Sequence, residues 1–108
     1  MKSINNQVVM KGNLGTDIQI TQTEKGFKVA RFSLAQNTFK KDESGKKSWN
    51  TTWYRMFAWG NMATTLETNL KKGQSLFVSG RLVNRTYINR KGTPRKITEV
   101  EVQSFAMV

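Results

Sequence analysis

The chain has 108 residues, enough for one domain with one hydrophobic core. It carries 18 Lys+Arg against 7 Asp+Glu, so the formal net charge is 18 − 7 = +11, which favours a polyanionic partner. Because Cys and His are both absent, disulfide frameworks, zinc–thiolate sites, cysteine nucleophiles and Ser-His-Asp triads are excluded. Apolar runs are too short for a membrane span or a secretory segment. The composition favours a binding protein over an enzyme.

Alternation of apolar and polar side chains dominates the first half of the chain and predicts strands. Gly12 falls where the first strand would kink or bulge, and Ile18 and Ile20 continue the alternation beyond it. The 24–26 segment is a turn signal, and the polar 40–48 segment is centred on Ser44-Gly45, as in a hairpin connection. Three long strands are therefore predicted: residues 7–14, 28–39 and 49–59.

A single helix is predicted after the third strand. Asn61 can cap its start and Gly73 can close its end. Its apolar stripe consists of Met62, Ala63, Leu66 and Leu70. Two further strands follow, over residues 75–88 and 95–105, with a turn at 90–94 between them.

The order of three strands, one helix and two strands predicts an all-β fold. Five curled antiparallel strands with a helix between the third and fourth are typical of the OB-fold, a five-stranded Greek-key barrel. We therefore expect residues 1–108 to form one OB-fold domain, with no C-terminal linker or acidic tail.

The third long strand predicts a wet face that mixes rings with a cation. Its odd positions include Trp49, Trp53, Arg55 and Trp59, and burying all the rings would bury the arginine with them. Phe57 shares this phase, but a bulge would turn it inward, so it is left out of the predicted site.

Two other strands repeat the mixture of arginine and aromatic side chains. Arg31 and Phe39 share one phase of the second strand. On residues 75–88 the expected inward side chains are Leu76, Val78, Gly80 and Leu82, and the opposite phase carries Arg81, Val83, Arg85 and Tyr87. Residues 81–98 hold six basic side chains and no acid, which is +6 of the +11. Rings that stack bases, at roughly 1–3 kcal/mol each, beside cations that follow phosphates are what a single strand of nucleic acid needs.

Five stretches carry a resemblance to a known family: N-Q-V-V-M-K-G-N-L-G-T-D at 6–17, V-A-R-F-S-L-A at 29–35, T-T-W-Y-R-M-F-A-W-G-N at 51–61, L-K-K-G-Q-S-L-F-V-S-G-R-L at 70–82 and I-T-E-V-E-V at 97–102. Together, in this order, they resemble the DNA-binding domain of bacterial single-stranded DNA-binding proteins. The resemblance implies an OB-fold protomer that coats single-stranded DNA without sequence choice, with no enzyme activity and no cofactor. It further implies a homotetramer, with a homodimer as the alternative.

The resemblance also implies which side chains bind the DNA. The family's stacking positions map onto Phe39, Trp53, Trp59 and Tyr87. With the cations and Trp49 added, the predicted DNA-binding set is Phe39, Trp53, Arg55, Trp59, Tyr87, Arg31, Arg81, Arg85, Trp49, Lys72, Arg90 and Lys91. Catalytic, cofactor and metal residues are not predicted.

The resemblance places the protein in the bacterial cytoplasm, associated with the nucleoid, where it would protect single strands during replication, recombination and repair. Family members usually continue into a flexible linker and an acidic tip that recruits replication and repair proteins. Those partners are not predicted here, because this chain carries no such tip. A trimmed chain and a naturally tailless form both remain open.

Other functions fit the residues less well. A replication-restart adaptor would form a dimer and lack the full set of rings, and a cold-shock RNA chaperone would need clustered Phe/His motifs. The glycines of G-N-L-G at 12–15 do not join a strand to a helix, so they do not make a phosphate loop. Asp42 with Glu43, and Glu99 with Glu101, are the close carboxylate pairs, and both lie among basic neighbours, which disfavours a nuclease.

Overall fold

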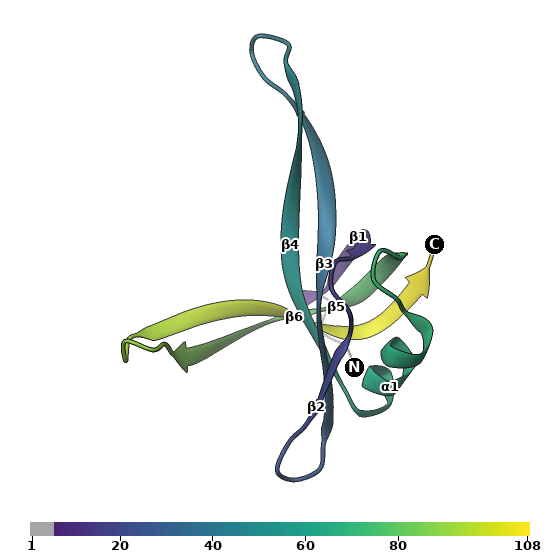
Figure 1. The fold of residues 1–108 in the computed structure, drawn as a ribbon, viewed down its shortest axis with the longest axis vertical. Coiled ribbons are helices and arrows are strands. Elements are labelled where there is room, and N and C mark those ends of the chain that lie inside the picture. The colour runs from purple at the N-terminus through teal and green to yellow at the C-terminus, as the bar shows by residue number, and fades with distance from the viewer. Residues whose placement is uncertain (1–5) are drawn as a thin grey trace.

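The computed structural model describes residues 6–108 and shows one helix and a single six-stranded sheet (Figure 1). In chain order the elements are β1 (Val8–Leu14), β2 (Gln19–Gln22), β3 (Lys28–Lys41), β4 (Lys47–Trp59), α1 (Gly60–Asn69), β5 (Ser75–Ile88) and β6 (Pro94–Met107). The five predicted long strands and the helix between the third and fourth of them are confirmed. The short β2, which contains Ile20, is an additional strand that pairs only with the start of β3.

The five long strands close into a barrel. Their order is β1-β5-β6-β4-β3, and a further pairing between β1 and β3 joins the two ends. Closure needs one parallel contact, made where Met56 of β4 pairs with Val100 of β6, while the other ladders are antiparallel. This is the predicted OB-fold architecture.

Gly12 allows β1 to take part in both edges of this closure. β1 pairs with β5 through residues 8–13 and with β3 at Asn13 and Leu14. A Cβ at Gly12 would stand 2.6 Å from the carbonyl oxygen of Ala35 in β3, closer than packed atoms come. The β1–β5 register runs through Gly12 without a shift, so the expected bulge is absent. The glycine is needed for the close approach of a neighbouring backbone.

The core lies inside the barrel and is built from alternate residues of each long strand. It contains Leu14, Phe32, Leu34, Met56, Ala58, Leu66, Leu70, Leu76, Val78, Val100 and Val102. α1 contributes Leu66 to this cluster and packs against β3, β4 and β6. The apolar stripe of the helix is buried because it covers strand side chains that would otherwise face water.

The ends of α1 differ from those predicted. The N-cap is Trp59, which makes no side-chain capping hydrogen bond, so Asn61 lies inside the first turn and the predicted Asn61 cap is wrong. The helix ends at Asn69, and Gly73 lies in the turn that follows, with φ 92°. Lys71 and Lys72, which the sequence also places at the C-terminal end of the predicted helix, lie after Asn69 and outside the helix.

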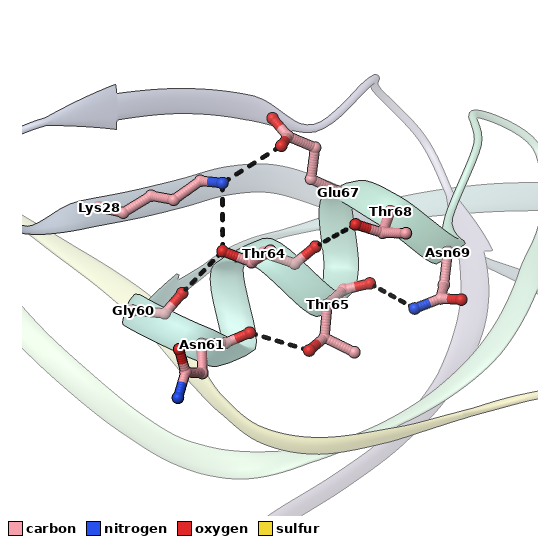
Figure 2. A network of polar contacts seen from close by, with 8 residues as sticks. All are labelled: Lys28, Gly60, Asn61, Thr64, Thr65, Glu67, Thr68 and Asn69. Atoms are coloured by element: carbon pink, nitrogen blue, oxygen red, sulfur yellow. Dashed lines mark hydrogen bonds and ion pairs between the residues drawn. The ribbon is translucent and has the colours of Figure 1, made fainter.

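Side-chain hydrogen bonds hold the polar face of α1 (Figure 2). The hydroxyls of Thr65 and Thr68 donate to carbonyl oxygens four residues earlier, at 2.9 and 2.8 Å. Lys28 of β3 donates to the Thr64 hydroxyl and to Glu67, both at 3.2 Å. The threonine bonds stay within the helix, whereas the two Lys28 contacts tie this threonine-rich helix of low intrinsic propensity to the strand beside it.

The chain has three hairpins, which connect β2 with β3, β3 with β4 and β5 with β6 and extend in different directions (Figure 1). We call residues 37–51 the β3–β4 arm and residues 84–98 the β5–β6 arm. Leu82, predicted to face inward, is 47% exposed, because β5 leaves the barrel just after the buried Gly80. Leu82 lies on the core side of the sheet, because it pairs with the buried Val100. Its side chain stays exposed because it lies past the end of the closed barrel.

Candidate nucleic-acid interface

Strand register brings the predicted site residues of β3 and β4 onto one face. Directly paired residues of neighbouring strands project from the same side of a sheet. Phe39 pairs with Trp49, and Trp53 pairs with Ala35. The same ladder places the other site residues of these strands on that side, through the pairs Ser33↔Arg55, Arg31↔Phe57 and Val29↔Trp59.

The same face continues onto β6 and β5. Phe57 of β4 pairs with Glu101 of β6, which in turn pairs with Arg81 of β5. Farther along the β5–β6 ladder, Arg85 pairs with Ile97 and Tyr87 with Arg95. We call this four-stranded surface the aromatic–basic face; its predicted site residues are Arg31, Phe39, Trp49, Trp53, Arg55, Trp59, Arg81, Arg85 and Tyr87.

The rings of this face are open to solvent, as the alternation predicts. Their exposed fractions are 70% for Trp49, 57% for Trp53, 47% for Phe39, 46% for Trp59 and 43% for Tyr87. Exposing this much aromatic area is unfavourable in a free monomer, and such surface marks a binding site.

Trp53 lies over the backbone of Gly15, at the end of the G-N-L-G segment. A Cβ at Gly15 would be 2.3 Å from Cζ3 of the indole, so only glycine leaves room for the ring in this position. The Gly15 amide donates to the carbonyl of Ser33 at 2.8 Å, which fixes this backbone to β3. The segment is no phosphate loop; its second glycine supports an aromatic ring.

Phe39 and Trp49 form a cross-strand pair on the β3–β4 arm. Their ring centroids are 5.1 Å apart at an interplanar angle of 62°, an edge-to-face arrangement. Lys47 places its Nζ 5.9 Å from the Phe39 centroid. The arm therefore carries two rings and a cation well beyond the barrel.

Phe57 is buried although it keeps the outward phase. Its side chain is 7% exposed, and the β3–β4 register contains no bulge that would turn it inward. Trp59 packs against it edge-to-face, with centroids 6.3 Å apart, and the Arg31 guanidinium lies 5.7 Å from its ring centroid. Phe57 is thus covered on the outer face by its neighbours and supports Trp59 and Arg31 from below.

Three arginines of the face are ion-paired, which the sequence did not predict. Arg31 and Arg85 both donate to Glu99, and Arg81 donates to Glu101 at 2.8 Å. A signal was present in the sequence, because the alternation of β6 puts Glu99 and Glu101 on the phase opposite Val100 and Val102. Only the register between strands shows which arginines these acids meet.

Two cavities flank Arg55, where the arms diverge. One, of about 290 Å³, is lined by Arg31, Arg55, Arg85 and Glu99 together with residues of β3 and the 16–19 segment. The other, of about 430 Å³, lies between Trp53 and the exposed Leu82 and includes Lys96 and Ile97. Arg55 is the predicted arginine common to both.

The remaining predicted residues lie off the face. Arg90 and Lys91 are in the turn at the tip of the β5–β6 arm. Lys72 is in the turn after α1, next to Gly73, whose amide donates to the Leu14 carbonyl at 2.7 Å. That bond ties the turn to the residue before Gly15, although Lys72 lines neither of the two cavities.

Acidic side chains do not gather into a metal site in residues 6–108. This part of the chain has no group of three or more Asp, Glu, His or Cys side chains placed to hold a metal ion. Over the same residues, no helix is long and apolar enough to cross a membrane.

Comparison with known proteins gives consistent results. The sequence profile of the single-strand binding protein family matches residues 5–108. Single-stranded DNA-binding protein 1 of Chlorobaculum tepidum is 35% identical over 104 residues, which are 95% of this chain and 64% of that protein. Single-stranded DNA-binding protein 1 of Xylella fastidiosa strain 9a5c is 31% identical, over 95% of this chain and 76% of that protein.

Structural comparison supports the same relationship. A solved Plasmodium falciparum SSB complex with ssDNA superimposes with a TM-score of 0.84 at 28% identity, covering 100% of this chain and 97% of that one. The chain spans a little less than two thirds of the Chlorobaculum relative, and 60% of the Xanthomonas campestris single-stranded DNA-binding protein. Profile, relatives and fold agree, and the chain belongs to the single-strand binding protein family.

Proposed function

We propose that this protein binds and protects single-stranded DNA without sequence preference, as a DNA-binding domain with no enzyme activity. The observation that carries the proposal is the aromatic–basic face, which presents exposed rings from β3, β4 and β5 beside arginines on one continuous surface. Every base has a π-face, so stacking on such rings is tolerant of sequence. The family relationship supports the same function.

The mechanism divides between rings and cations. Bases stack on Phe39, Trp53, Trp59 and Tyr87, with Trp49 extending the platform along the β3–β4 arm. Phosphates are neutralised by the arginines of the face and by Arg90 and Lys91 at the tip of the β5–β6 arm. The net charge of +11 attracts the strand at long range.

Intrinsic tryptophan fluorescence tests this function. Oligo-dT should quench the emission of Trp49, Trp53 and Trp59, and higher salt should weaken binding with a log–log slope of about −0.7 for each phosphate neutralised. A duplex of the same length should quench much less, because its bases are already stacked on each other. An equal response to both DNAs, or no response, would contradict the proposal and favour a protein–protein adaptor.

The protein acts as a homo-oligomer, and the proposed state is a tetramer, with a dimer as the alternative. Two features outside the aromatic–basic face support self-association. Residues 8–12 of β1 pair with β5 on one side only within the described chain, which leaves a free strand edge. Beside it an apolar patch contains the exposed Val9 and Phe77 together with Phe105 and Ala106.

Light scattering on the purified protein distinguishes the oligomeric states. Val9→Asp would put a charge into the proposed contact and should lower the measured mass, while the far-UV spectrum stays that of a folded barrel. A monomeric mass for the unchanged protein would contradict the self-association proposal.

The biological setting that we propose is the bacterial cytoplasm and nucleoid, in replication, recombination and repair, in keeping with the bacterial sources of the relatives.

A further inference from the structure

Glu99 is the one charged side chain that is buried within residues 6–108, at 4% exposure. It projects from β6 toward the aromatic–basic face and contacts arginines of two other strands. One carboxylate oxygen accepts from Nη1 of Arg31 at 2.7 Å, and the other accepts from Nε of Arg85 at 2.5 Å. A buried carboxylate is tolerated because both of its oxygens are paired with cations.

The two arginines keep most of their hydrogen-bonding capacity. A guanidinium has five N–H donors, and Glu99 uses one from each arginine. The side chains of Arg31 and Arg85 remain 42% and 47% exposed, so the other donors can reach solvent. Arg31 is held further by the Phe57 ring beneath it. Glu99 therefore orients two guanidinium groups without saturating them.

Both arginines line the same cavity of about 290 Å³, together with Arg55. Arg55 makes no ion pair with any carboxylate of the described residues. Three arginines and one carboxylate leave a charge of 3 − 1 = +2 around this cavity. An oriented set of guanidinium donors around a concave surface is suited to a phosphate group, which accepts several charge-assisted hydrogen bonds.

We propose that this cavity binds one backbone phosphate of the single strand, and that Glu99 is the positioning residue that holds Arg31 and Arg85 for it. The inference rests on the proposed function, since it assigns a place for the phosphate of that same ligand. Glu99 itself does not touch the DNA. Its carboxylate fixes the direction of the guanidinium groups before the strand arrives, so less side-chain entropy is lost on binding.

Removal of the Glu99 carboxylate has opposite expected effects on DNA binding, depending on whether the carboxylate positions the arginines or only neutralises their charge. Removing a carboxylate from the binding face makes the protein more positive, which strengthens binding to a polyanion. Glu101 provides the matched control, because it lies two residues away on the same strand and face and pairs only with Arg81. The two glutamates therefore have the same charge effect, but only Glu99 holds arginines that line this cavity.

The first experiment compares Glu99→Gln with Glu101→Gln in oligo-dT binding over a series of salt concentrations. A glutamine at 99 keeps one acceptor oxygen and turns an NH₂ toward the second guanidinium, which releases that arginine. We expect Glu99→Gln to bind roughly 10-fold more weakly, because the guanidinium groups are no longer directed at the phosphate and its contacts in this cavity are lost. The salt slope should become shallower by about 0.7, since one phosphate fewer is neutralised. Glu101→Gln should bind as tightly as the unchanged protein, or more tightly.

Each other outcome overturns the inference. Equal or tighter binding by Glu99→Gln would mean that the carboxylate only neutralises its arginines. Weaker binding with an unchanged salt slope would mean a structural role without a phosphate contact. If the unchanged protein does not bind oligo-dT, both the proposed function and this inference are wrong. If Glu99→Gln and Glu101→Gln change binding equally, the inference is wrong but the proposed function stands.

A second pair of variants covers the case in which Glu99→Gln does not fold. Arg85→Lys keeps a positive charge beside the buried carboxylate of Glu99, but it replaces the planar, forked guanidinium with an ammonium group. Arg81→Lys makes the same change beside Glu101. We expect Arg85→Lys to weaken oligo-dT binding several-fold more than Arg81→Lys does, and equal effects of the two changes would overturn the inference.

Discussion

Gly15 supports the ring of Trp53, and this contact is possible because position 15 has no side chain. A Cβ at position 15 would lie 2.3 Å from the indole Cζ3 and 2.9 Å from Cε3. The backbone of Gly15 is not in the left-handed region, so an alanine there would meet the ring and not a forbidden backbone conformation. Because Trp53 is more than half exposed, the ring has room to tilt away.

Gly15→Ala should therefore weaken binding through Trp53. Trp53→Ala removes one stacked base and should cost roughly 1–3 kcal/mol of binding free energy. Gly15→Ala should cost part of this amount, with the barrel still folded. Dissociation constants for oligo-dT measured by fluorescence anisotropy give both values.

The double variant separates the ring from other effects of the alanine. If Gly15 acts by supporting the indole, Gly15→Ala adds nothing to Trp53→Ala. A further loss in the double variant would place the role of Gly15 elsewhere, and unchanged binding by a folded Trp53→Ala protein would remove Trp53 from the site.

At the scale of elements, the three hairpins end in the same five-residue turn. The turns are residues 23–27, 42–46 and 89–93. In each, the amide of the first residue donates to the fifth carbonyl, and the fourth residue is a glycine whose amide donates to the first carbonyl. These glycines have φ values of 84°, 82° and 78°, which an L-residue rarely adopts. The side chain of the first residue, Thr23, Asp42 or Asn89, accepts a backbone N–H in every case.

Asp42 makes one of these turns sensitive to pH. The Ser44 hydroxyl and the Lys46 amide both donate to its carboxylate, and these hydrogen bonds lower the pKa of Asp42 below its ordinary value. A carboxyl whose pKa is lowered by folding stabilises the turn fully above its ordinary pKa, and the contribution is lost as the pH falls through the lowered pKa. The turn at the tip of the β3–β4 arm should therefore loosen only at a pH below the ordinary range of aspartate.

Amide NMR shifts of Lys46 during acidification test this expectation. The matched control is Thr93, whose amide donates at 2.9 Å to Asn89 in the equivalent turn. Since asparagine does not titrate, Thr93 should not follow the Lys46 transition. A Lys46 transition at the ordinary aspartate pKa, or simultaneous changes at both amides, would contradict the assignment.

At the scale of the whole molecule, the aromatic–basic face continues from the barrel onto both arms. The arms project in different directions and the molecule measures 55 × 39 × 31 Å, so the face is long and curved (Figure 1). The turn at the tip of the β5–β6 arm has a charge of +2 from Arg90 and Lys91. The corresponding turn between β2 and β3 has no net charge at these positions, where Glu24 and Lys25 cancel. We therefore expect the β5–β6 tip to hold phosphates at one end of this face.

Replacing both tip cations should lower affinity without changing base contacts. Arg90→Ala with Lys91→Ala should make the salt slope shallower by about 0.7 for each phosphate that the tip neutralises. The tryptophan quenching at saturation should stay the same, because the rings are untouched. Lys25→Ala, in a turn of the same geometry, is the control and should have little effect. An unchanged slope for the tip variant would exclude the tip from the DNA path.

Much of the fold was predictable because its signals are local. Alternation with a period of two sets the side of the sheet on which each residue lies, and turn residues mark where strands end. This is why the element order, and the shared phases of Arg31 with Phe39 and of Trp53 with Arg55, were predicted correctly. The helix ends were not, because Asn61 and Gly73 are residue types that favour helix ends but the strand before and the turn after set the boundaries.

Long-range contacts decided the rest, because they depend on which strands become neighbours. The sequence alone determined the barrel class, the phase of each ring and the surplus of positive charge. Only the tertiary structure decided that Leu82 lies beyond the covered part of its strand and that Phe57 is buried on the outer phase. It also brought Gly15 beneath Trp53 and placed Glu99 between two arginines. Arg85 meets Glu99 across one hairpin, but Arg31 lies far from Glu99 along the chain and reaches it only when the barrel closes.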